Sequence, residues 1–368
     1  MKPKLLCILH CSPPSHGAAK VGDFISSSQK LNKNFDCLFI SIKSSDTIGD
    51  IGKFSLRKIY LLVELFIKVF WALVCFRPEK IYYTASIRSV AFYRDLLVST
   101  LWKCYKLFFS VEIYYHYHTK GVNDFVSAST PNLILTRFFV RGVNLILLSP
   151  MLRNDFEKIN SYNAIYYLPN GVEDPLGICE FNEIINNKFY SKNALNILFL
   201  SNMIKSKGYF RVLELAMMYK SQNINFHFAG EWQYNKDKIE FFNYISDNNL
   251  EDSVTFHGFV SGLQKKQLFK NAHFLVFPTT FEAFGLCIVE ALSYGVPVLS
   301  TNEGSIPFIL DNQCGVLIND KCDLPNALEQ AMESLLDQKT AIYCRERYLE
   351  HFSLKQFENN LVDLLNGR

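Results

Sequence analysis

Short apolar runs alternate with longer stretches of mixed polarity along this chain of 368 residues. In the first half, strand-like runs occur at residues 4–10, 36–42, 80–84, 111–118, 144–149 and 164–168. Helical patterns lie between them, at residues 18–31, 59–76, 91–109 and 133–140. Strands that alternate with helices predict a parallel sheet that is covered on both faces.

The same alternation begins again near residue 195. Strand-like runs occur at residues 196–200, 225–229, 254–257, 274–277 and 298–300. Helical patterns occur at residues 209–220, 236–247, 263–272 and 285–294, and the tail from residue 324 is mostly helical. Each half opens with a strand, a glycine-containing loop and a helix, so we expect two doubly wound halves that bind a ligand at the carboxyl ends of their strands.

The turn signal Asn170-Gly171 separates the two halves, and a polar stretch without a clear period follows it. We therefore expect an N-terminal domain at residues 1–172, a linker at 173–194 and a second domain at 195–350. The C-terminal helix, at residues 351–368, is expected to pack back on the first domain.

Residues 59–76 form the most apolar segment of the chain. Its two charges, Glu64 and Lys68, stand one helical turn apart and mark one solvated or paired side of a helix. This pattern favours a buried or half-buried helix, and a membrane-docking surface or a membrane span are the alternatives.

Composition describes a globular protein, with 49% hydrophobic and 20% charged residues. The net charge of +3 is too small to indicate nucleic-acid binding. The 10 cysteines contain no CxxC pair, which is typical of reduced thiols in a cytosolic protein. The apolar run at residues 5–9 is short and is soon followed by Pro13 and Pro14, so a first strand fits better than a signal peptide.

Residues 277–300 hold the pattern with the clearest chemistry. Glu282 stands in a loop after an apolar strand, and Glu290 lies in the helix that follows. Gly285 lets the backbone at the start of this helix approach an anion, which the amide groups and the helix dipole attract. Carboxylates on both sides of a phosphate site suit a ligand that also offers hydroxyl groups, such as a nucleotide-sugar. The alternative interpretation is a capping glutamate and a glutamate on the helix surface.

This segment resembles the signature of the family 4 retaining glycosyltransferases, also called group 1 glycosyltransferases. The matching positions are Glu282, Phe284, Gly285, Glu290, Ala291, Gly295, Pro297 and Val298. The family usually has Gly after the first Glu, where this chain has Ala283. The resemblance implies the α/β fold called GT-B, in which two Rossmann-like doubly wound parallel-sheet domains face one another across a cleft.

By the same resemblance, Glu282 would be a catalytic residue that contacts the donor sugar, and Glu290 would bind the ribose. The backbone amides at the start of the helix would meet the phosphates. They belong to Phe284, Gly285 and Leu286.

A second loop, at residues 200–208, carries Lys205 and Lys207 between a strand and a helix. Cations at this place can neutralise a diphosphate leaving group, and the alternative is a solvated loop with ordinary surface lysines. The pair Lys207-Gly208 resembles the family pattern. The family has an Arg where this chain has Asn202, so Lys205 is a candidate to replace that contact.

Two features of the first half also resemble the family. Gly17 precedes a helix, where the family places a donor contact, and Pro13 and Pro14 stand just before it. His116 and His118 alternate on a strand, and the resemblance places a catalytic histidine in the cleft at this strand end. His118 is the first choice for that role and His116 the second.

Residues 257–260 resemble a turn that meets the nucleobase in the family, which makes Phe259 and Val260 donor-binding candidates. The chain has no Asp-x-Asp motif, and the His-x-His pair has no third ligand at a suitable spacing. We therefore expect no metal and no cofactor, with a nucleoside diphosphate sugar as donor substrate.

The resemblance implies a metal-independent hexosyltransferase that moves a hexose-type sugar, with retention, from a nucleoside diphosphate sugar such as a UDP-sugar. The acceptor would be a glycan or a lipid-linked molecule in bacterial surface polysaccharide or lipopolysaccharide biosynthesis. We expect a cytoplasmic protein with peripheral contact at the inner face of the plasma membrane. A non-catalytic nucleotide-sugar-binding subunit and a nucleotide-sugar epimerase are the alternatives.

Overall fold

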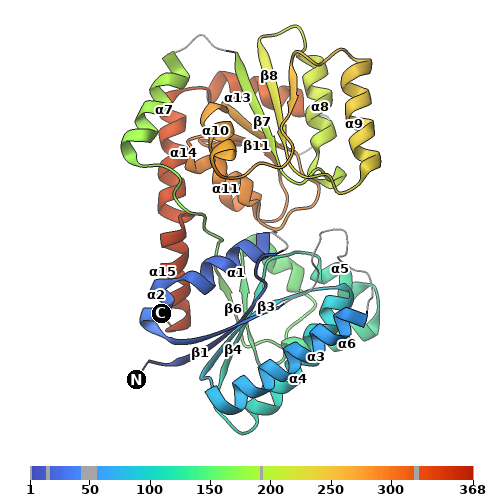
Figure 1. Cartoon of the computed structure of the whole chain (residues 1–368), viewed down its shortest axis with the longest axis vertical. Coiled ribbons are helices and arrows are strands. Elements are labelled where there is room, and N and C mark those ends of the chain that lie inside the picture. The colour runs from blue at the N-terminus through green and yellow to red at the C-terminus, as the bar shows by residue number, and fades with distance from the viewer. Residues whose placement is uncertain (1, 14–16, 43–55, 191–193, 319–322, 368) are drawn as a thin grey trace. The chain divides into compact units, whose positions relative to one another are not determined.

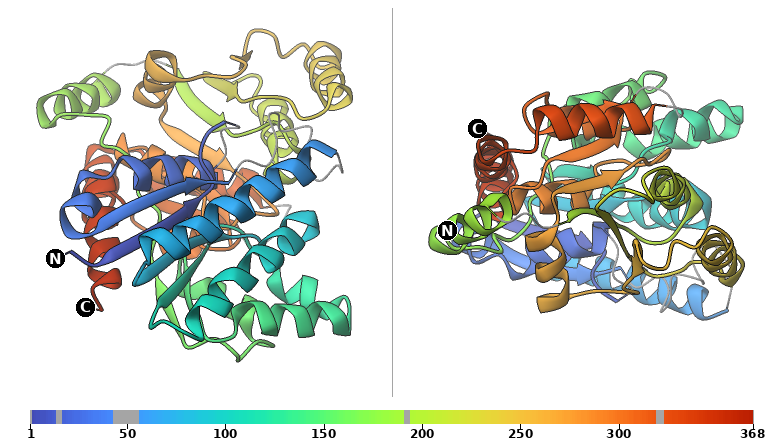
Figure 2. Two further views of the ribbon diagram at one scale, coloured as in Figure 1. Left: turned by 60° about the horizontal axis from the view of Figure 1, so that its bottom comes forward. Right: turned by 90° about the horizontal axis from the view of Figure 1, so that it is seen from above.

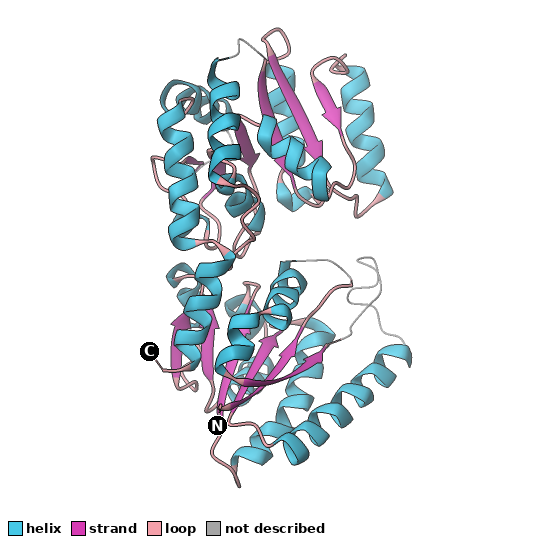
Figure 3. Ribbon diagram, turned by 60° about the vertical axis from the view of Figure 1, so that its left-hand side comes forward, coloured by secondary structure: helices cyan, strands magenta, loops and turns pink. Residues whose placement is uncertain are grey.

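The structure, a computed structural model, describes residues 2–13, 17–42, 56–190, 194–318 and 323–367. The chain divides into two compact units. Unit 1 comprises Met1–Asn170 and Leu354–Arg368, and unit 2 comprises Gly171–Ser353. Each unit contains a parallel sheet of six strands with helices on both faces (Figures 1 and 3).

The sheet of unit 1 has the strand order β2-β1-β3-β4-β5-β6. Its strands are β1 (Lys4–Leu9), β2 (Asp36–Ser41), β3 (Lys80–Ala85), β4 (Glu112–Tyr117), β5 (Asn144–Leu147) and β6 (Ala164–Tyr167). In each of β1, β3 and β4 every residue after the first is buried. Helices cover both faces of the sheet, so both sides of these strands are buried. The runs are therefore mainly apolar and do not alternate between polar and apolar residues.

The helices of unit 1 broadly follow the predicted pattern. They are α1 (Gly17–Ser27), α2 (Gln29–Asn34), α3 (Leu56–Trp71), α4 (Ser89–Lys106), α5 (Val122–Ser127), α6 (Thr130–Val140) and α15 (Leu354–Leu365), with a π-helical turn at Ala72–Phe76 and a 3-10 helix at Pro150–Phe156. The helix expected at residues 18–31 is two helices, because the Ser28 hydroxyl accepts the Leu31 amide and caps α2.

Helix α15 completes the core of unit 1. Its residues Phe357, Leu361 and Leu365 are buried together with side chains of β1, β3, β4, α1 and α2. The Lys30 ammonium of α2 also donates a hydrogen bond to the Asn359 side chain of α15. The last described helix of the chain is therefore a structural part of its first unit.

Residues 59–76 form a helix with one buried side, which is the half-buried form of the prediction rather than the fully buried one. The segment lies in α3 and the π-helical turn, has a mean hydropathy of 2.2 and is long and apolar enough to cross a membrane, but only 22% of it is buried. Leu65, Val69 and Leu73 enter the unit, whereas Tyr60 and Trp71 are exposed. Glu64 and Lys68 mark one solvated side in the sequence, but the other exposed positions are apolar, so the sequence does not show how far the exposed side extends.

The sheet of unit 2 has the strand order β12-β11-β10-β7-β8-β9. Its strands are β7 (Leu195–Leu200), β8 (Ile224–Ala229), β9 (Val254–Phe256), β10 (Phe274–Phe277), β11 (Val298–Thr301) and β12 (Gly315–Ile318). The sequence pattern located the first five and missed the edge strand β12, whose two middle residues are only partly buried.

The helices of unit 2 are α7 (Ile178–Tyr190), α8 (Tyr209–Met218), α9 (Asn235–Asp247), α10 (Gly262–Asn271), α11 (Leu286–Ser293), α12 (Ile306–Ile309), α13 (Leu324–Ser334) and α14 (Gln338–His351), with a 3-10 turn at Lys205–Lys207. Helix α7 occupies most of the segment expected to be a linker. Glu180 of α7 forms ion pairs with Lys266 and Lys270 of α10, which attach this helix to the unit.

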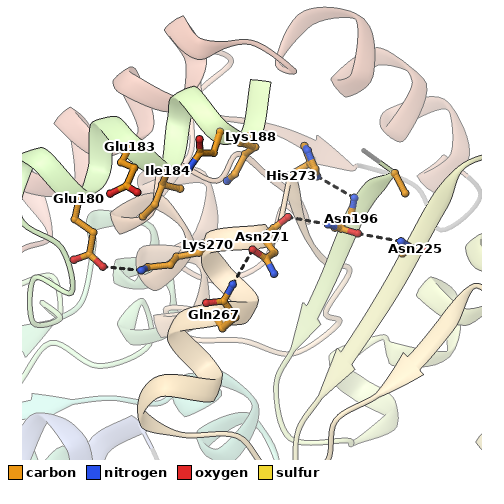
Figure 4. A pocket seen from close by; sticks show the side chains of 12 residues that line it. Glu180, Glu183, Ile184, Lys188, Asn196, Asn225, Gln267, Lys270, Asn271 and His273 are labelled. Carbon is orange, nitrogen blue, oxygen red and sulfur yellow. Dashed lines mark hydrogen bonds and ion pairs between the residues drawn. The ribbon is translucent and has the colours of Figure 1, made fainter. Parts of the chain in front are cut away.

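A polar pocket lies at the amino ends of β7 and β8, between these strands and helices α7 and α10 (Figure 4). His273 Nδ1 accepts a hydrogen bond from the Asn196 amide at 3.0 Å. Burial, with a smaller contribution from the Lys188 ammonium, lowers the pKa of His273 from 6.5 to about 4. The imidazole is therefore held neutral in the folded unit.

Substituting Leu361→Ala should destabilise unit 1, because the side chain is 2% exposed in its core. We expect a loss of about 2–5 kcal/mol in the free energy of unfolding. Urea unfolding followed by circular dichroism measures it. Asp363→Ala, at an exposed position of the same helix, is the control and should change stability by less than about 0.5 kcal/mol. Equal effects would show that α15 does not contribute to the core.

His273 should make unit 2 less stable in acid. Because its pKa is lower in the folded than in the unfolded chain, its contribution is complete above pH 6.5 and is lost as the pH falls toward 4. We expect acidification over this interval to cost the wild type about 1–3 kcal/mol more than His273→Asn, in which an amide oxygen replaces the Nδ1 acceptor. Urea unfolding at pH 6.5 and at pH 4 measures this difference, and His351→Asn, at an exposed histidine, is the control. Equal losses in wild type and His273→Asn would contradict the assignment.

Candidate active site

The candidate site of unit 2 lies where two neighbouring strands end. Strands β7 and β10 are hydrogen-bonded in parallel, with Phe274 opposite Ile197 and Leu275 opposite Leu198. Parallel neighbours release their following loops at the same edge of the sheet. The loop after β7, at residues 201–208, therefore meets the loop after β10, at residues 278–285.

These two loops are in direct backbone contact. The Thr280 amide donates to the Ser206 carbonyl at 2.8 Å, and the Thr279 hydroxyl donates to the same oxygen at 3.0 Å. Gly208 has a positive φ of 83°, and a Cβ atom at this position would lie 2.2 Å from the Pro278 carbonyl oxygen. A glycine is therefore required twice, by its conformation and by the closeness of the second loop.

Lys207 and Glu282 join the loops at their centre. Lys207 Nζ lies 2.9 Å from Glu282 Oε2 and donates to the Phe281 carbonyl at 3.0 Å. The other carboxylate oxygen of Glu282 accepts the amides of Ala283 and Phe284, at 2.9 and 3.3 Å. Both side chains are about one-fifth exposed, so the pair is fixed in geometry and still reachable from solvent.

Helix α11 starts directly after this pair. Its N-cap residue Gly285 has a φ of 93° and provides no side chain to cover the amides of the first turn. Amides at a helix start lack partners within the helix and carry the positive end of its dipole. A cation at Lys207 and a helix start beside it form a place where a phosphate group can bind.

Glu290 lies farther along α11 and has a partner that the sequence did not reveal. Its Oε1 atom is 2.6 Å from Nζ of Lys265, on α10. Cys287 stands between the two ion pairs, and burial, then the carboxylates of Glu282 and Glu290, raise the pKa of its thiol. The only possible signal for Lys265 was its place in the helix before β10, which does not indicate a partner 25 residues away.

A third loop, between β11 and α12, also holds Glu282 and was not anticipated. Gly304 has a φ of 54°, and a Cβ atom there would lie 2.1 Å from the Glu282 carbonyl oxygen. The Ser305 amide donates to the Ala283 carbonyl at 2.9 Å. The possible signal was the polar, glycine-containing run that follows the strand-like run at residues 298–300.

The structure does not bring Lys205 to the Lys207–Glu282 pair. Its ammonium lies 2.8 Å from Glu240 and 3.7 Å from Asp237, both on α9. Asn202 lies in the loop after β7, which passes close to Gly230: a Cβ atom at Gly230 would be 1.8 Å from the Ser201 carbonyl oxygen.

The turn after β9 is fixed by a hydrogen bond from the Gly230 amide to the Gly258 carbonyl at 2.8 Å. Its two candidate residues differ in accessibility. Phe259 is 66% exposed, whereas Val260 is 7% exposed. Phe259 therefore presents its ring to solvent, and Val260 contributes mainly to packing.

The candidates of unit 1 lie at the start of α1 and after β4. Gly17 is the first residue of α1, and Pro14 lies outside the described residues. His118 follows the end of β4 and is partly exposed, and its ring centroid lies 4.0 Å from that of the buried His116. His116 Nδ1 is hydrogen-bonded to the Tyr82 hydroxyl, and burial, followed by His118, keeps the pKa of His116 well below 6.5.

Groups of three or more His, Cys, Asp or Glu side chains that could hold a metal ion do not occur among the described residues. Lys207 and the amides around Glu282 are groups by which this part of the chain can bind an anion.

Comparison with known proteins connects this site to a family. Residues 180–350 match the family model of the group 1 glycosyl transferases, and this range includes Lys207, Glu282 and Glu290. An uncharacterized 41.2 kDa protein in the cps region of Klebsiella pneumoniae is 29% identical over 210 residues. The match covers 55% of this chain and 53% of that protein, so the chain matches about half the length of this relative.

Solved structures share the fold of the whole chain. The sucrose-phosphate synthase of Thermosynechococcus elongatus matches with a TM-score of 0.73 at 16% identity, over 100% of this chain and 99% of that one. Anabaena HepE, in complex with UDP and glucose, matches with a TM-score of 0.68 at 15% identity, over 100% of both chains. Residues 180–350 of the chain thus match the group 1 glycosyltransferases, and its two doubly wound units are those of the GT-B fold.

Proposed function

We propose that the protein transfers a hexose-type sugar from a nucleoside diphosphate sugar to a glycan or lipid-linked acceptor, with retention of the anomeric configuration. The observation that carries the proposal is the Lys207–Glu282 pair, held by backbone amides at the start of α11. It combines a cation, a helix start and a carboxylate, which suit a diphosphate and the hydroxyl groups of a sugar.

Each group has a proposed role in the transfer. Lys207 has three N–H donors, of which two bind Glu282 and Phe281, and the third would bind a phosphate oxygen of the leaving group. The amides of Gly285 and Leu286 would bind the phosphates, joined by that of Phe284 once it leaves the Glu282 carboxylate, and Glu282 would accept hydroxyl groups of the sugar. Glu290, oriented by Lys265, would accept the ribose hydroxyls.

In the proposed reaction, a bond forms between the acceptor oxygen and the anomeric carbon, and the bond from that carbon to the phosphate oxygen breaks. The leaving diphosphate takes the proton of the acceptor hydroxyl on the same face of the sugar. His118 and Gly17 are proposed contacts of the transferred sugar and the donor, Phe259 and Val260 of the nucleobase, and Asn202 and Lys205 of the diphosphate side.

Two relatives support the choice of substrate class. HepE was solved with UDP and glucose, which favours a UDP-sugar as donor. The Klebsiella relative is described by its place in the cps region, which favours surface polysaccharide biosynthesis. We place the protein in the cytoplasm, with peripheral contact at the inner face of the plasma membrane, where lipid-linked acceptors are found.

A thermal-shift screen with UDP-, GDP- and ADP-sugars tests donor binding, and mass spectrometry of reactions with candidate acceptors tests transfer. We expect stabilisation by one nucleotide class and a product one sugar heavier than the acceptor. An isomerised donor without acceptor would indicate an epimerase. Donor binding without product for every acceptor tried would favour a non-catalytic binding subunit.

Glu282→Gln should lower kcat by about 100-fold or more, because the variant keeps the size of the side chain and loses the charge that faces the sugar. Steady-state assay of product measures the effect, and Glu251→Gln, at an exposed turn of the same unit, is the control. Full activity of Glu282→Gln would reject the site.

Comparison of the single variants Lys207→Met and Lys205→Met distinguishes the contributions of these two lysines, both in the loop after β7, to donor binding. We expect Lys207→Met to weaken donor binding at least about tenfold, since it removes the cation next to Glu282. Lys205→Met should have the smaller effect, because its ammonium binds Glu240. Titration of the donor by calorimetry measures both, and an equal loss would show that Lys205 leaves Glu240 and contributes as much as Lys207 at the diphosphate.

A further inference from the structure

Two neighbouring helices of unit 1 expose apolar side chains. Helices α3 and α4 are packed against each other (Figures 1 and 2). On α3 and the π-helical turn that follows it, the exposed side chains recur at helical spacing and form one stripe. These side chains are Ile59, Tyr60, Val63, Ile67, Phe70, Trp71 and Val74.

Helix α4 has a similar stripe. Its exposed apolar side chains are Val90, Tyr93, Leu97, Leu107 and Phe108. Leu107 and Phe108, just past the end of the helix, are 79% and 80% exposed. A soluble surface rarely exposes so many large apolar side chains on adjoining helices unless the surface binds something.

The arrangement of α3 favours contact with a surface rather than passage through a membrane. Leu65, Val69 and Leu73 are buried within the unit, so only the opposite side of the helix is available to a partner. The two charges in the segment, Glu64 and Lys68, form an ion pair with each other. The stripe includes Tyr60 and Trp71, whose rings are both apolar and polar, a type of side chain enriched at the membrane–water boundary.

Charge distinguishes the unit that carries this face. Unit 1 contains 23 Lys and Arg residues against 13 Asp and Glu, a formal charge of +10. Unit 2 contains 15 against 22, a formal charge of −7. The small net charge of the whole chain thus conceals a strongly basic unit, and an anionic partner would be attracted to it.

A basic cluster lies at the end of the α4 stripe. Lys103 Nζ is 5.2 Å from the centre of the Phe138 ring and donates to the Arg141 carbonyl, and Lys106 Nζ donates to the Gly142 carbonyl. Burial, then repulsion by Lys106 and Arg141, lowers the pKa of Lys103 to about 8. Anionic groups placed near this cluster would relieve that repulsion.

We propose that the α3–α4 face, formed by these two stripes and the basic cluster of Lys103, Lys106 and Arg141, docks unit 1 on a lipid bilayer with anionic head groups. The apolar side chains enter the boundary between head groups and acyl chains, and the cations bind lipid phosphates. The proposal names the surface behind the membrane contact proposed above and does not depend on the donor site in unit 2.

Flotation of the full chain with vesicles tests the proposal. We expect binding to vesicles that contain phosphatidylglycerol, and much weaker binding to pure phosphatidylcholine. Ile67→Ser with Trp71→Ser should reduce partitioning about tenfold or more, because both side chains are exposed on the stripe. The matched control is Ile239→Ser with Phe242→Ser, which removes exposed apolar side chains from α9 of the acidic unit and should leave partitioning unchanged.

Lys103→Gln with Lys106→Gln should abolish the preference for anionic vesicles and the sensitivity of binding to salt. The variant should keep the circular dichroism spectrum of the wild type, which excludes misfolding. It should also keep the thermal shift that the wild type shows with the nucleotide-sugar, which shows that the donor site in unit 2 is unaffected. Absence of wild-type binding to either vesicle would overturn the proposal. Membrane attachment that resists high salt and carbonate would indicate a membrane span and would also overturn it. So would a dimer in sedimentation that Ile67→Ser with Trp71→Ser dissociates, if the protein binds no vesicles.

Discussion

The parallel pairing of β7 with β10 is the constraint on which the candidate site depends. These strands are separated by more than seventy residues in sequence, yet their pairing places a lysine from one loop within hydrogen-bonding distance of a glutamate from the other. The contact is possible only because Gly208 and Gly304 leave room for the backbones that hold Glu282. The geometry of the ion pair is therefore a property of the sheet rather than of either loop alone.

This constraint also bears on how the acidic unit 2 would bind the anionic donor proposed for it. Unit 2 has a formal charge of −7, which would repel a diphosphate at long range. At short range, however, Lys207 and the start of α11 determine the field, because screening by salt limits the influence of distant surface charges. Binding of the proposed donor would thus depend on this local field rather than on the overall charge of the unit.

Sequence patterns predicted most strands because a parallel sheet covered on both faces makes each strand a continuous apolar run. They failed where the pattern is weak: β12 is an edge strand that is only partly buried, and α7 lies in a polar stretch that is held by Glu180 and two lysines of α10. In the candidate site, Lys207, Glu282 and Glu290 could be proposed because their places after a strand or within the following helix coincide with the family resemblance. Lys265 and Gly304 could not, because their importance arises from contacts between segments that only the fold brings together.

The same limit applies to α3. Its sequence indicates a strongly apolar helix, but which side faces inward depends on the neighbours that cover it, α4 among them. A segment that appears suited to a core is therefore divided between the interior of unit 1 and its surface.

The position of α15 has a consequence for the biosynthesis of the protein. The core of unit 1 includes Phe357, Leu361 and Leu365, which the ribosome adds only after all of unit 2. The unit that emerges first is thus the last to be completed, and its apolar surface beneath α15 remains uncovered while residues 171–353 are made. Unit 2 is one continuous stretch of chain, so all of its core residues are present once residue 353 has been added. During synthesis, a chaperone would accordingly be needed chiefly by the first unit, on the side that α15 later covers.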